Sequence, residues 1–303
     1  MARINAIIRA KMKIKIGTRA SALALAQTEL LTKELLFFLP EAEIEVVRIK
    51  TTGDLLYEQS LVDIGGKALF VKEIEDALVE KKIDIAVHSM KDMSIALPAG
   101  LKIGCVLSRE DRRDAFVSLK YNTLAEMPEG SKLGTCSSRR KVLAHKFNDK
   151  ITIQELRGNI VTRVRKLNEG VVDAIILAVA GLKRIDYQHV IKEILPSELF
   201  IPAATQGIIC GECRQDDLFI SSLLEKLTHK KTLIESIVER AFLKAIGGGC
   251  KTPVGIYTKV NKEHIDFIAF SAINDMYEEY MGQLVISKPN EFEMIFKEII
   301  EHC

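Results

Sequence analysis

Several arginines lie where a predicted strand gives way to a helix. Arg19 precedes one helix, Arg139 and Arg140 lie in the first turn of another, and Arg157 precedes the helix that carries Arg163. A cation near a helix N-terminus opposes the helix dipole, at roughly 0.3–1 kcal/mol each. A bound carboxylate or phosphate removes that cost. One such arginine is more often a solvated surface residue, but three junctions of this kind favour a ligand with several negative charges, bound at the carboxyl ends of the strands.

A second polar group follows directly after an apolar strand, in the run VHSMKD at 87–92. Polar residues at the carboxyl end of a strand occupy the usual active-site edge of an open sheet. Asp92, beside Lys91, could steer a proton or stabilise a developing cation. A capped turn with a surface Lys–Asp pair explains the same spacing, so the pattern alone leaves both interpretations open.

Cys250 lies in a glycine-rich turn, GGGCKTP at 247–253, after a predicted helix. Glycines let the backbone approach a ligand or another domain closely. The neighbouring Lys251 favours the thiolate, which is the nucleophilic form of cysteine. The turn therefore favours a reactive thiol over an idle one, although any glycine loop could carry an idle thiol.

Two further motifs give weaker signals. Lys67, in GGKALF at 65–70, lacks the spacing and the Lys-Ser/Thr ending of a phosphate-binding loop. Cys210 and Cys213 have CxxC spacing, but a structural zinc site normally needs a second pair of ligands, and none appears. A redox disulfide is an alternative for this pair. The apolar run before it favours a buried strand, and no metal site is expected.

The elements that must position these residues alternate between strand and helix over the first ninety residues. This order predicts a mainly parallel sheet with helices on its faces. The expected elements are a strand at 13–17, a helix at 21–39 that Pro40 closes, a strand at 43–50, a helix at 67–82 and a strand at 84–88.

The same order restarts near residue 132. The runs KIGTRAS at 15–21 and KLGTCSS at 132–138 both place a strand, then Gly-Thr, then a serine at the start of a helix. Two related lobes are therefore expected. The second lobe's expected elements are strands at 132–135, 151–156 and 173–178, with helices at 137–147 and 160–168.

The pattern changes again from about Lys230. Consecutive strands without intervening helices predict a small antiparallel α+β domain. A helix is expected to Ile246, then strands at 254–260, 264–273 and 281–287, and a last helix from about Glu291.

Composition excludes several classes of protein. The net charge is only +2, and Lys and Arg are scattered along the 303 residues, whereas a nucleic-acid binder shows a basic stripe or domain. No apolar stretch is long enough to span a bilayer. The six irregularly spaced cysteines indicate reduced thiols in a reducing compartment, so a cytoplasmic protein is expected. The basic segment before Met12 is interpreted as a dispensable extension, with a start at Met12 as the alternative.

Taken together, these residues resemble the porphobilinogen deaminase (hydroxymethylbilane synthase) family. The matching runs occur in the family's order over essentially the whole chain, and the set is highly specific. They are GTRAS at 17–21, TGD at 52–54, GGKALFVKE at 65–73, AVHSMKD at 86–92, LRGN at 156–159, AGLKR at 180–184 and GGGCKTPV at 247–254.

The resemblance implies an α/β fold with two lobes like those of type II periplasmic binding proteins, followed by a small C-terminal α+β domain. The implied divisions are 1–107 with about 208–227, then 108–207, then 228–303. It also implies a transferase of heme biosynthesis that carries a dipyrromethane cofactor on Cys250 through a thioether. Four porphobilinogen molecules are added to this primer head to tail, each losing ammonia, and water releases hydroxymethylbilane. A monomer without nucleic-acid or membrane partners is expected.

The resemblance also assigns roles to individual residues. Asp92, with Lys91, matches the catalytic position, where a carboxylate can stabilise the cation formed when ammonia leaves. Because the growing chain accumulates acetate and propionate groups, many of the matching positions are basic. Those implied for the cofactor are Cys250, Lys67, Ser89, Asp92, Ser137, Arg139 and Arg140, and those for substrate are Arg19, Ser21, Gln27, Arg157, Arg163 and Arg184.

The chain departs from the family's pattern at a few positions. Cys136 and Ser138 alter the run before the paired arginines, for which changed loop packing rather than lost binding is expected. Thr205 replaces a glycine and is expected to stiffen the crossing between lobes. Asp63 stands where some relatives have lysine, which puts one cationic contact in doubt. The alternative function, a non-catalytic anion-binding protein with two lobes, would leave Cys250 without a cofactor.

Overall fold

The computed structural model describes residues 12–52, 71–249, 252–273 and 276–301. It divides the chain into two compact units, Met1–Ser108 with Ile209–His229, and Arg109–Ile208 with Lys230–Cys303. Among the described residues, no helix has the length and hydropathy that a membrane span requires. The extension before Met12 lies outside the described residues.

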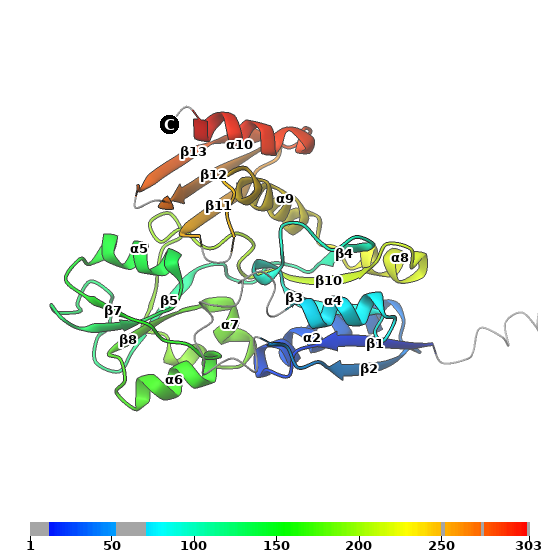
Figure 1. Cartoon of the computed structure of the whole chain (residues 1–303), viewed down its shortest axis with the longest axis horizontal. Helices are drawn as coiled ribbons and strands as arrows, with labels where there is room; N and C mark the ends of the chain where they lie inside the picture. Colours follow the sequence, from blue (N-terminus) through cyan, green and yellow to red (C-terminus); the bar gives the residue numbers. More distant parts are fainter. Residues whose placement is uncertain (1–11, 53–70, 250–251, 274–275, 302–303) are drawn as a thin grey trace, which may run out of the picture. The chain divides into compact units, whose positions relative to one another are not determined.

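The first unit is a five-stranded sheet with helices on both faces (Figure 1). The strand order is β2-β1-β3-β10-β4, in which β1 runs parallel to β2 and β3, and β10 runs antiparallel to β3 and β4. The elements are β1 (Lys13–Thr18), α2 (Ala22–Phe38), β2 (Glu43–Arg48), α4 (Lys72–Val79), β3 (Ile85–Ser89), the 3-10 turn η1 (Met90–Asp92), β4 (Leu101–Val106), β10 (Ile209–Arg214) and α8 (Leu218–Lys226).

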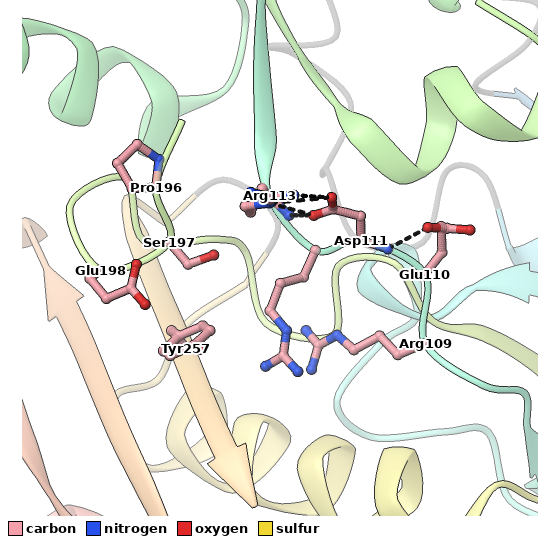
Figure 2. Close-up of a pocket in the computed structure, with 9 residues that line it drawn as sticks. Arg109, Glu110, Asp111, Arg113, Pro196, Ser197, Glu198 and Tyr257 are labelled. Atoms are coloured by element: carbon pink, nitrogen blue, oxygen red, sulfur yellow. Dashed lines mark hydrogen bonds and ion pairs between the residues drawn. The ribbon is translucent and has the colours of Figure 1, made fainter. Parts of the chain in front are cut away.

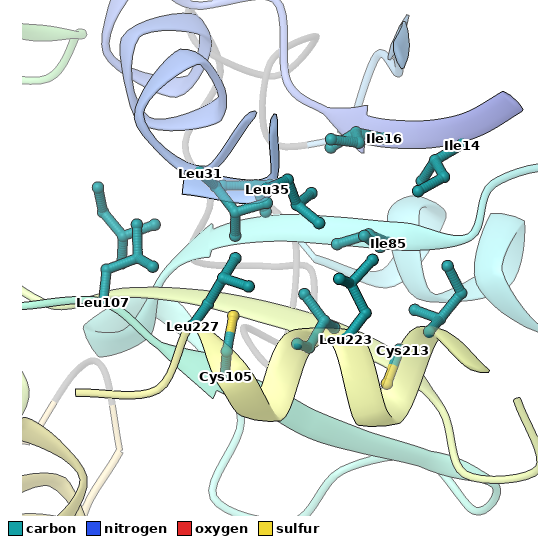
Figure 3. Packing of buried hydrophobic residues seen from close by; sticks show 14 residues of the cluster. Ile14, Ile16, Leu31, Leu35, Ile85, Cys105, Leu107, Cys213, Leu223 and Leu227 are labelled. Atoms are coloured by element: carbon teal, nitrogen blue, oxygen red, sulfur yellow. The ribbon is translucent and has the colours of Figure 1, made fainter. Parts of the chain in front are cut away.

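The core of this unit forms because apolar residues point inward from the strands, and because two helices, α2 and α4, pack their apolar faces against them. Ile14 and Ile16 point inward from β1, and Leu31 and Leu35 from α2 pack against the same cluster (Figure 3). Helix α4 belongs to a second cluster, with Ala86 of β3. Burying each Leu or Ile side chain contributes about 1.5–3 kcal/mol. These two clusters fix the helices against the sheet and so position the ends of its strands.

The second unit contains another five-stranded sheet, in the order β7-β6-β8-β5-β9. In each sheet one strand lies between the next two strands along the chain and runs parallel to both: β1 between β2 and β3, and β6 between β7 and β8. An antiparallel strand then follows in each sheet, β10 beside β3 and β5 beside β8. The expectation of two related lobes is thereby confirmed. The elements are β5 (Asp114–Ser118), β6 (Lys132–Gly134), α5 (Ser138–Phe147), β7 (Thr152–Gln154), α6 (Ile160–Asn168), β8 (Ala174–Ala178), α7 (Val179–Arg184), the 3-10 turn η2 (Gln188–Val190) and β9 (Glu193–Ile194).

The C-terminal part of the second unit is the expected small antiparallel α+β layer, with strand order β11-β12-β13. Its core is aromatic: the ring of Phe296 lies 5.4 Å from that of Phe242 and 5.1 Å from that of Phe267, both in edge-on arrangements. The elements are α9 (Lys230–Ala245), β11 (Val254–Val260), β12 (His264–Ser271), β13 (Glu278–Val285), the 3-10 turn η4 (Pro289–Glu291) and α10 (Phe292–Glu301).

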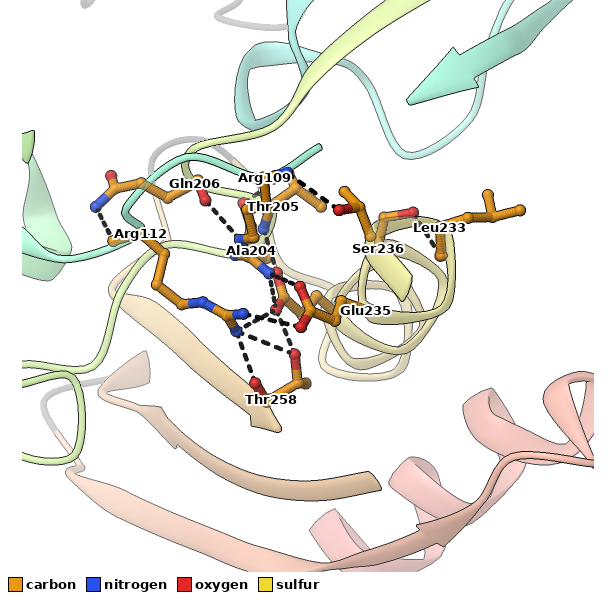
Figure 4. Close-up of polar contacts among 11 residues, drawn as sticks. Arg109, Arg112, Ala204, Thr205, Gln206, Leu233, Glu235, Ser236 and Thr258 are labelled. Atoms are coloured by element: carbon orange, nitrogen blue, oxygen red, sulfur yellow. Dashed lines mark hydrogen bonds and ion pairs between the residues drawn. The ribbon is translucent and has the colours of Figure 1, made fainter. Parts of the chain in front are cut away.

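A buried ion-pair network ties α9 to the rest of the second unit (Figure 4). The fully buried carboxylate of Glu239 accepts two hydrogen bonds from Arg109, at 2.6 and 3.0 Å. It also accepts from the backbone N–H of Thr205 and from the hydroxyl of Thr258. Pairing of this kind is required because an unpaired buried carboxylate is costly.

The starts of two elements differ most from expectation. The last strand was expected at 281–287, but β13 begins three residues earlier, where Glu278 pairs with Ser271 of β12. The helix expected at 67–82 is α4 at Lys72–Val79, and residues 53–70 lie outside the described residues. Lys81, two residues beyond the end of α4, has a left-handed backbone, with φ of 58°, so the helix ends before it.

Candidate functional site

In the first unit, polar residues follow the carboxyl ends of two adjacent parallel strands. Arg19 follows β1, and Ser21 caps α2 by accepting a hydrogen bond from the N–H of Ala24 at 3.3 Å. Lys91 and Asp92 lie in η1, directly after β3. Because β1 and β3 pair in parallel, their carboxyl ends lie at one edge of the sheet. Arg19, Ser21, Lys91 and Asp92 therefore lie at that edge.

The Asp92 side chain is exposed at this edge. No hydrogen bond or ion pair engages its carboxylate among the described residues. A charged, unpaired carboxylate is available to bind N–H groups or to stabilise a cation.

Gln27 connects the helix layer to the end of β3. Its side chain is buried, its Nε2 donates to Ser89 Oγ at 2.7 Å, and Ser89 Oγ lies 3.2 Å from Gln27 Oε1. Ser89 is the residue from which η1 begins. This pair therefore positions the start of the turn that carries Lys91 and Asp92, a role that the sequence pattern did not indicate.

In the second unit, Ser137 caps α5 just as Ser21 caps α2, by accepting from the N–H of Arg140 at 3.4 Å. The side chains of Arg139 and Arg140 are buried and share one carboxylate, that of Asp114 at the start of β5. Arg139 donates to Asp114 Oδ2 at 2.7 Å, and Arg140 donates to Oδ1 at 2.7 Å. The anion that the helix-dipole argument required is thus supplied within the chain. Contact between these arginines and a ligand stays a prediction.

The charge balance of this cluster is uneven. Burial by itself raises the pKa of Asp114, but the charges of Arg139 and Arg140 and their hydrogen bonds outweigh it and lower the pKa to about 2. Burial also lowers the pKa of Arg139, against the attraction of Asp114. Two guanidinium groups and one carboxylate leave one surplus positive charge beside the N-terminus of α5. That position attracts an anion.

Two other predicted arginines lie beyond the carboxyl end of β7, which is next to β6 in the sheet. Arg157 is half-buried and donates to Glu155 Oε1 at 2.6 Å, so part of its charge is balanced. Arg163, from the first turn of α6, donates to the carbonyl of Gly158 at 2.7 Å and lies 3.6 Å from Cys136 Sγ. Cys136, a departure from the family's pattern, therefore lies beside a predicted binding residue.

Arg184 ends α7, the short helix that follows β8. It donates to the carbonyl of Gly207 at 2.7 Å, and burial lowers its pKa to about 10, which leaves it charged at neutral pH. Gly207 has φ of 89°, and a Cβ here would lie 2.4 Å from the carbonyl oxygen of Glu110, so only glycine fits. Thr205 nearby also has a left-handed backbone, with φ of 59°. Its expected stiffening effect stays a prediction.

Three sequence-predicted positions cannot be placed. Cys250, Lys67 and the departure at Asp63 lie outside the described residues. The CxxC pair lies within the buried strand β10, as expected: Cys210 and Cys213 are buried and are not joined by a disulfide, and burial raises the pKa of Cys213 to about 11. Among the described residues, no cluster of His, Cys, Asp and Glu could hold a metal ion.

A pocket of about 470 Å³ lies elsewhere in the second unit, between residues 109–113, 196–198 and Tyr257 (Figure 2). None of the predicted site residues lines it. Its three arginines are matched by three acids, and Arg113 donates to Asp111 at 2.7 Å. It therefore lacks the surplus positive charge that a ligand with several carboxylates requires.

Asp114 was missed as a candidate residue. The available signal was an acid at the head of an apolar strand, in DAFV at 114–117, because a charge that enters a core needs a partner. The partner itself lies about 25 residues away, and spacing alone does not identify it.

Two family models match the chain. The first, "porphobilinogen deaminase, dipyromethane cofactor binding domain", matches residues 14–222, and the second, "porphobilinogen deaminase, C-terminal domain", matches residues 233–300. The chain is 45% identical to the porphobilinogen deaminase of Brevibacillus brevis, over 83% of this chain and 82% of the relative. It is 43% identical to that of Geobacter sulfurreducens, over 87% and 82%.

The similar solved structures are more distant. A putative methionine-binding lipoprotein of Bacillus subtilis is 13% identical, covers 73% of this chain and 92% of its own, and has a TM-score of 0.46. The methionine-binding protein MetQ is also 13% identical, with coverage of 75% and 94% and a TM-score of 0.47.

Proposed function

The chain belongs to the porphobilinogen deaminase family, and from this premise we propose which of its residues carry out the condensation of porphobilinogen. The family joins four porphobilinogen molecules head to tail with loss of ammonia, and water releases hydroxymethylbilane. Its members are transferases that use a dipyrromethane cofactor, and one matched family model is named for the binding of that cofactor. A non-catalytic binding protein is not favoured, because the matched models cover both parts of the chain.

The observation that carries the proposal is the placement of cationic groups at the carboxyl edge of each sheet. Each porphobilinogen brings an acetate and a propionate, so the ligand gains two carboxylates with every addition. Guanidinium groups bind carboxylates with paired, charge-assisted hydrogen bonds. The proposed substrate contacts are Arg19, Ser21, Gln27, Arg157, Arg163 and Arg184.

Asp92 is assigned the catalytic role, with Lys91 beside it. Loss of ammonia leaves positive charge on the pyrrole, and a carboxylate positioned beforehand stabilises such charge without reorganisation. The Asp92 side chain is exposed and has no partner within the part of the chain that the structure describes, which suits this role. It can also accept hydrogen bonds from pyrrole N–H groups.

The described residues fit a dipyrromethane. Its carboxylates suit the surplus charge of Arg139 and Arg140, the Ser137 hydroxyl and the N-terminus of α5, while Asp92 and Ser89 suit its pyrrole N–H groups. Bound through a thioether to Cys250, with Lys67 as a further contact, the cofactor supplies the primer for condensation. A cytoplasmic monomer completes the proposal. The cytoplasmic location agrees with four cysteines that form no disulfide, Cys105, Cys136, Cys210 and Cys213.

Replacing Arg157 with methionine tests the carboxylate contacts. We expect kcat/KM for porphobilinogen to fall about tenfold or more, because a hydrogen bond to a charged group contributes about 1.5–3 kcal/mol. The matched control is Arg165→Met on α6, whose exposed side chain pairs with Glu169. It should stay within about twofold of the wild type. Equal losses in the two variants would contradict the assignment of Arg157.

A further inference from the structure

The last residues of β3 lead into the turn that carries Asp92, and the sheet holds them on one side only. Within the described part of the chain, β1 pairs with β3 only at Ile85 and Ala86. The antiparallel strand β10 pairs along the other side of β3 as far as Ser89. Because the pairing with β1 stops short of the strand end, side-chain contacts are needed to fix that end further.

Two buried polar side chains meet beside this end of the strand. His88 of β3 is 5% exposed, and Glu212 of β10 is 0% exposed. Glu212 lies opposite Ala86 in the antiparallel register, so it is a diagonal neighbour of His88 on the same face of the sheet. His88 Nε2 lies 3.2 Å from Glu212 Oε2. The pair thus joins the end of β3 to the strand beside it.

Among the described residues, this contact is the only hydrogen bond of the Glu212 carboxylate, because its other oxygen, Oε1, has no partner there. An ionised carboxylate only accepts hydrogen bonds, so the bond requires a hydrogen on His88 Nε2. A buried carboxylate without a donor is costly. The imidazole of His88 is therefore held against Glu212.

The opposite face of the strand end carries a second contact. Successive side chains of a strand point to opposite faces, so Ser89 points away from the face of His88. Ser89 forms hydrogen bonds with the buried Gln27 of α2, at 2.7 and 3.2 Å. The same alternation places Ala86 in the cluster of α4 and Val87 in the cluster of α2. Two polar contacts, one on each face, thus flank the point at which η1 begins.

We propose that His88 and Glu212 are positioning residues for the condensation: their hydrogen bond fixes the end of β3, and so the turn that presents Asp92. Asp92 follows His88 by four residues, through the single turn of η1. A displacement of about 1 Å costs roughly 10²-fold in rate. The inference rests on the proposed role of Asp92. It assigns the function of the run CGEC at 210–213 to its acid, since both of its cysteines are buried.

Nuclear magnetic resonance of the holoenzyme, labelled with nitrogen-15 in its histidines, tests the hydrogen bond without reference to activity. We expect an imidazole Nε2–H that is protected from exchange with solvent, because it is buried and bonded. His88→Gln should lack this signal, and His145→Gln, an exposed control on α5, should keep it. In Glu212→Leu the proton should exchange faster. A wild type without such a proton, or its persistence in His88→Gln, would overturn the proposal.

Kinetics test the positioning role. Glu212→Gln keeps an acceptor for His88 Nε2 and should keep kcat within about threefold. Glu212→Leu removes the acceptor and should lower kcat about tenfold, with KM within about twofold. Glu225→Leu, the same substitution at an exposed position of α8, should behave as the wild type. Equal losses of kcat in Glu212→Gln and Glu212→Leu would refute the role of the hydrogen bond.

A double variant, His88→Leu with Glu212→Leu, distinguishes positioning from stability. Replacing a buried polar pair with apolar residues is often neutral for stability, so its melting temperature should stay near that of the wild type. Its kcat should nevertheless be as low as that of Glu212→Leu, and it replaces that variant if Glu212→Leu does not fold. Wild-type kcat in the double variant would contradict the positioning role. If Asp92→Asn kept its kcat while the protected Nε2–H was present, the proposed role of Asp92 would fail and the hydrogen bond would stand.

Discussion

Replacing Asp92 with asparagine is expected to lower kcat by about 10²- to 10³-fold, with KM within about threefold. An amide has nearly the shape of a carboxylate but no charge, so it loses the stabilisation of positive charge on the pyrrole. Because Asp92 is exposed and unpaired among the described residues, its removal should not disturb folding. Steady-state assays with porphobilinogen measure both constants.

The matched control for this variant is Asp76→Asn, an exposed aspartate of the same unit that pairs with Lys72. It should retain wild-type kcat, and both variants should melt within a few degrees of the wild type. An Asp92→Asn enzyme with kcat within threefold of the wild type would remove Asp92 from the catalytic role.

Replacing Asp114 with asparagine is expected to lower the free energy of unfolding by about 3–5 kcal/mol. The variant leaves Arg139 and Arg140 buried beside each other without a counter-ion. Glu169→Gln breaks the exposed pair with Arg165 and should cost less than about 1 kcal/mol. Urea denaturation of the three proteins measures the difference, and similar losses in both variants would contradict the buried-pair account.

The pH dependence of this effect has a definite sign. The pKa of Asp114 is depressed to about 2 from its ordinary 3.8, so its stabilisation is present above the unfolded value and is lost as the pH falls toward 2. The difference in free energy of unfolding between the wild type and Asp114→Asn should therefore decrease by about 1 kcal/mol as the pH falls from 6 to 3. If this difference in unfolding free energy increased on acidification, the ionised carboxylate of Asp114 would not be its source.

Local patterns were sufficient to predict much of the fold. The alternating residues of β1 and the apolar run of β3 specify strands, and Ser21 and Ser137 act as helix caps where the sequence placed helix starts. The shared Gly-Thr openings identified two lobes, because Gly17 and Gly134 both allow close packing. A Cβ would lie 2.3 Å from Ile83 at the first position and 2.8 Å from Leu156 at the second.

Contacts between residues that are far apart in the sequence were harder to predict from the sequence alone. The apolar run before Cys210 indicates a buried strand, but periodicity does not show that β10 lies between β3 and β4. The helix-dipole argument identified Arg139 and Arg140 as unusual, yet it could not choose between a ligand and an internal partner such as Asp114.

The central claim is that Cys250 carries a dipyrromethane, and the intact mass of the purified protein tests it most directly. Wild type and Cys136→Ser should exceed the mass of the bare chain by one dipyrromethane, whereas Cys250→Ser should match the bare chain. The same adduct on Cys250→Ser would place the attachment on another residue. A wild-type chain that is bare, and that stays bare and inactive after incubation with porphobilinogen, would contradict the account.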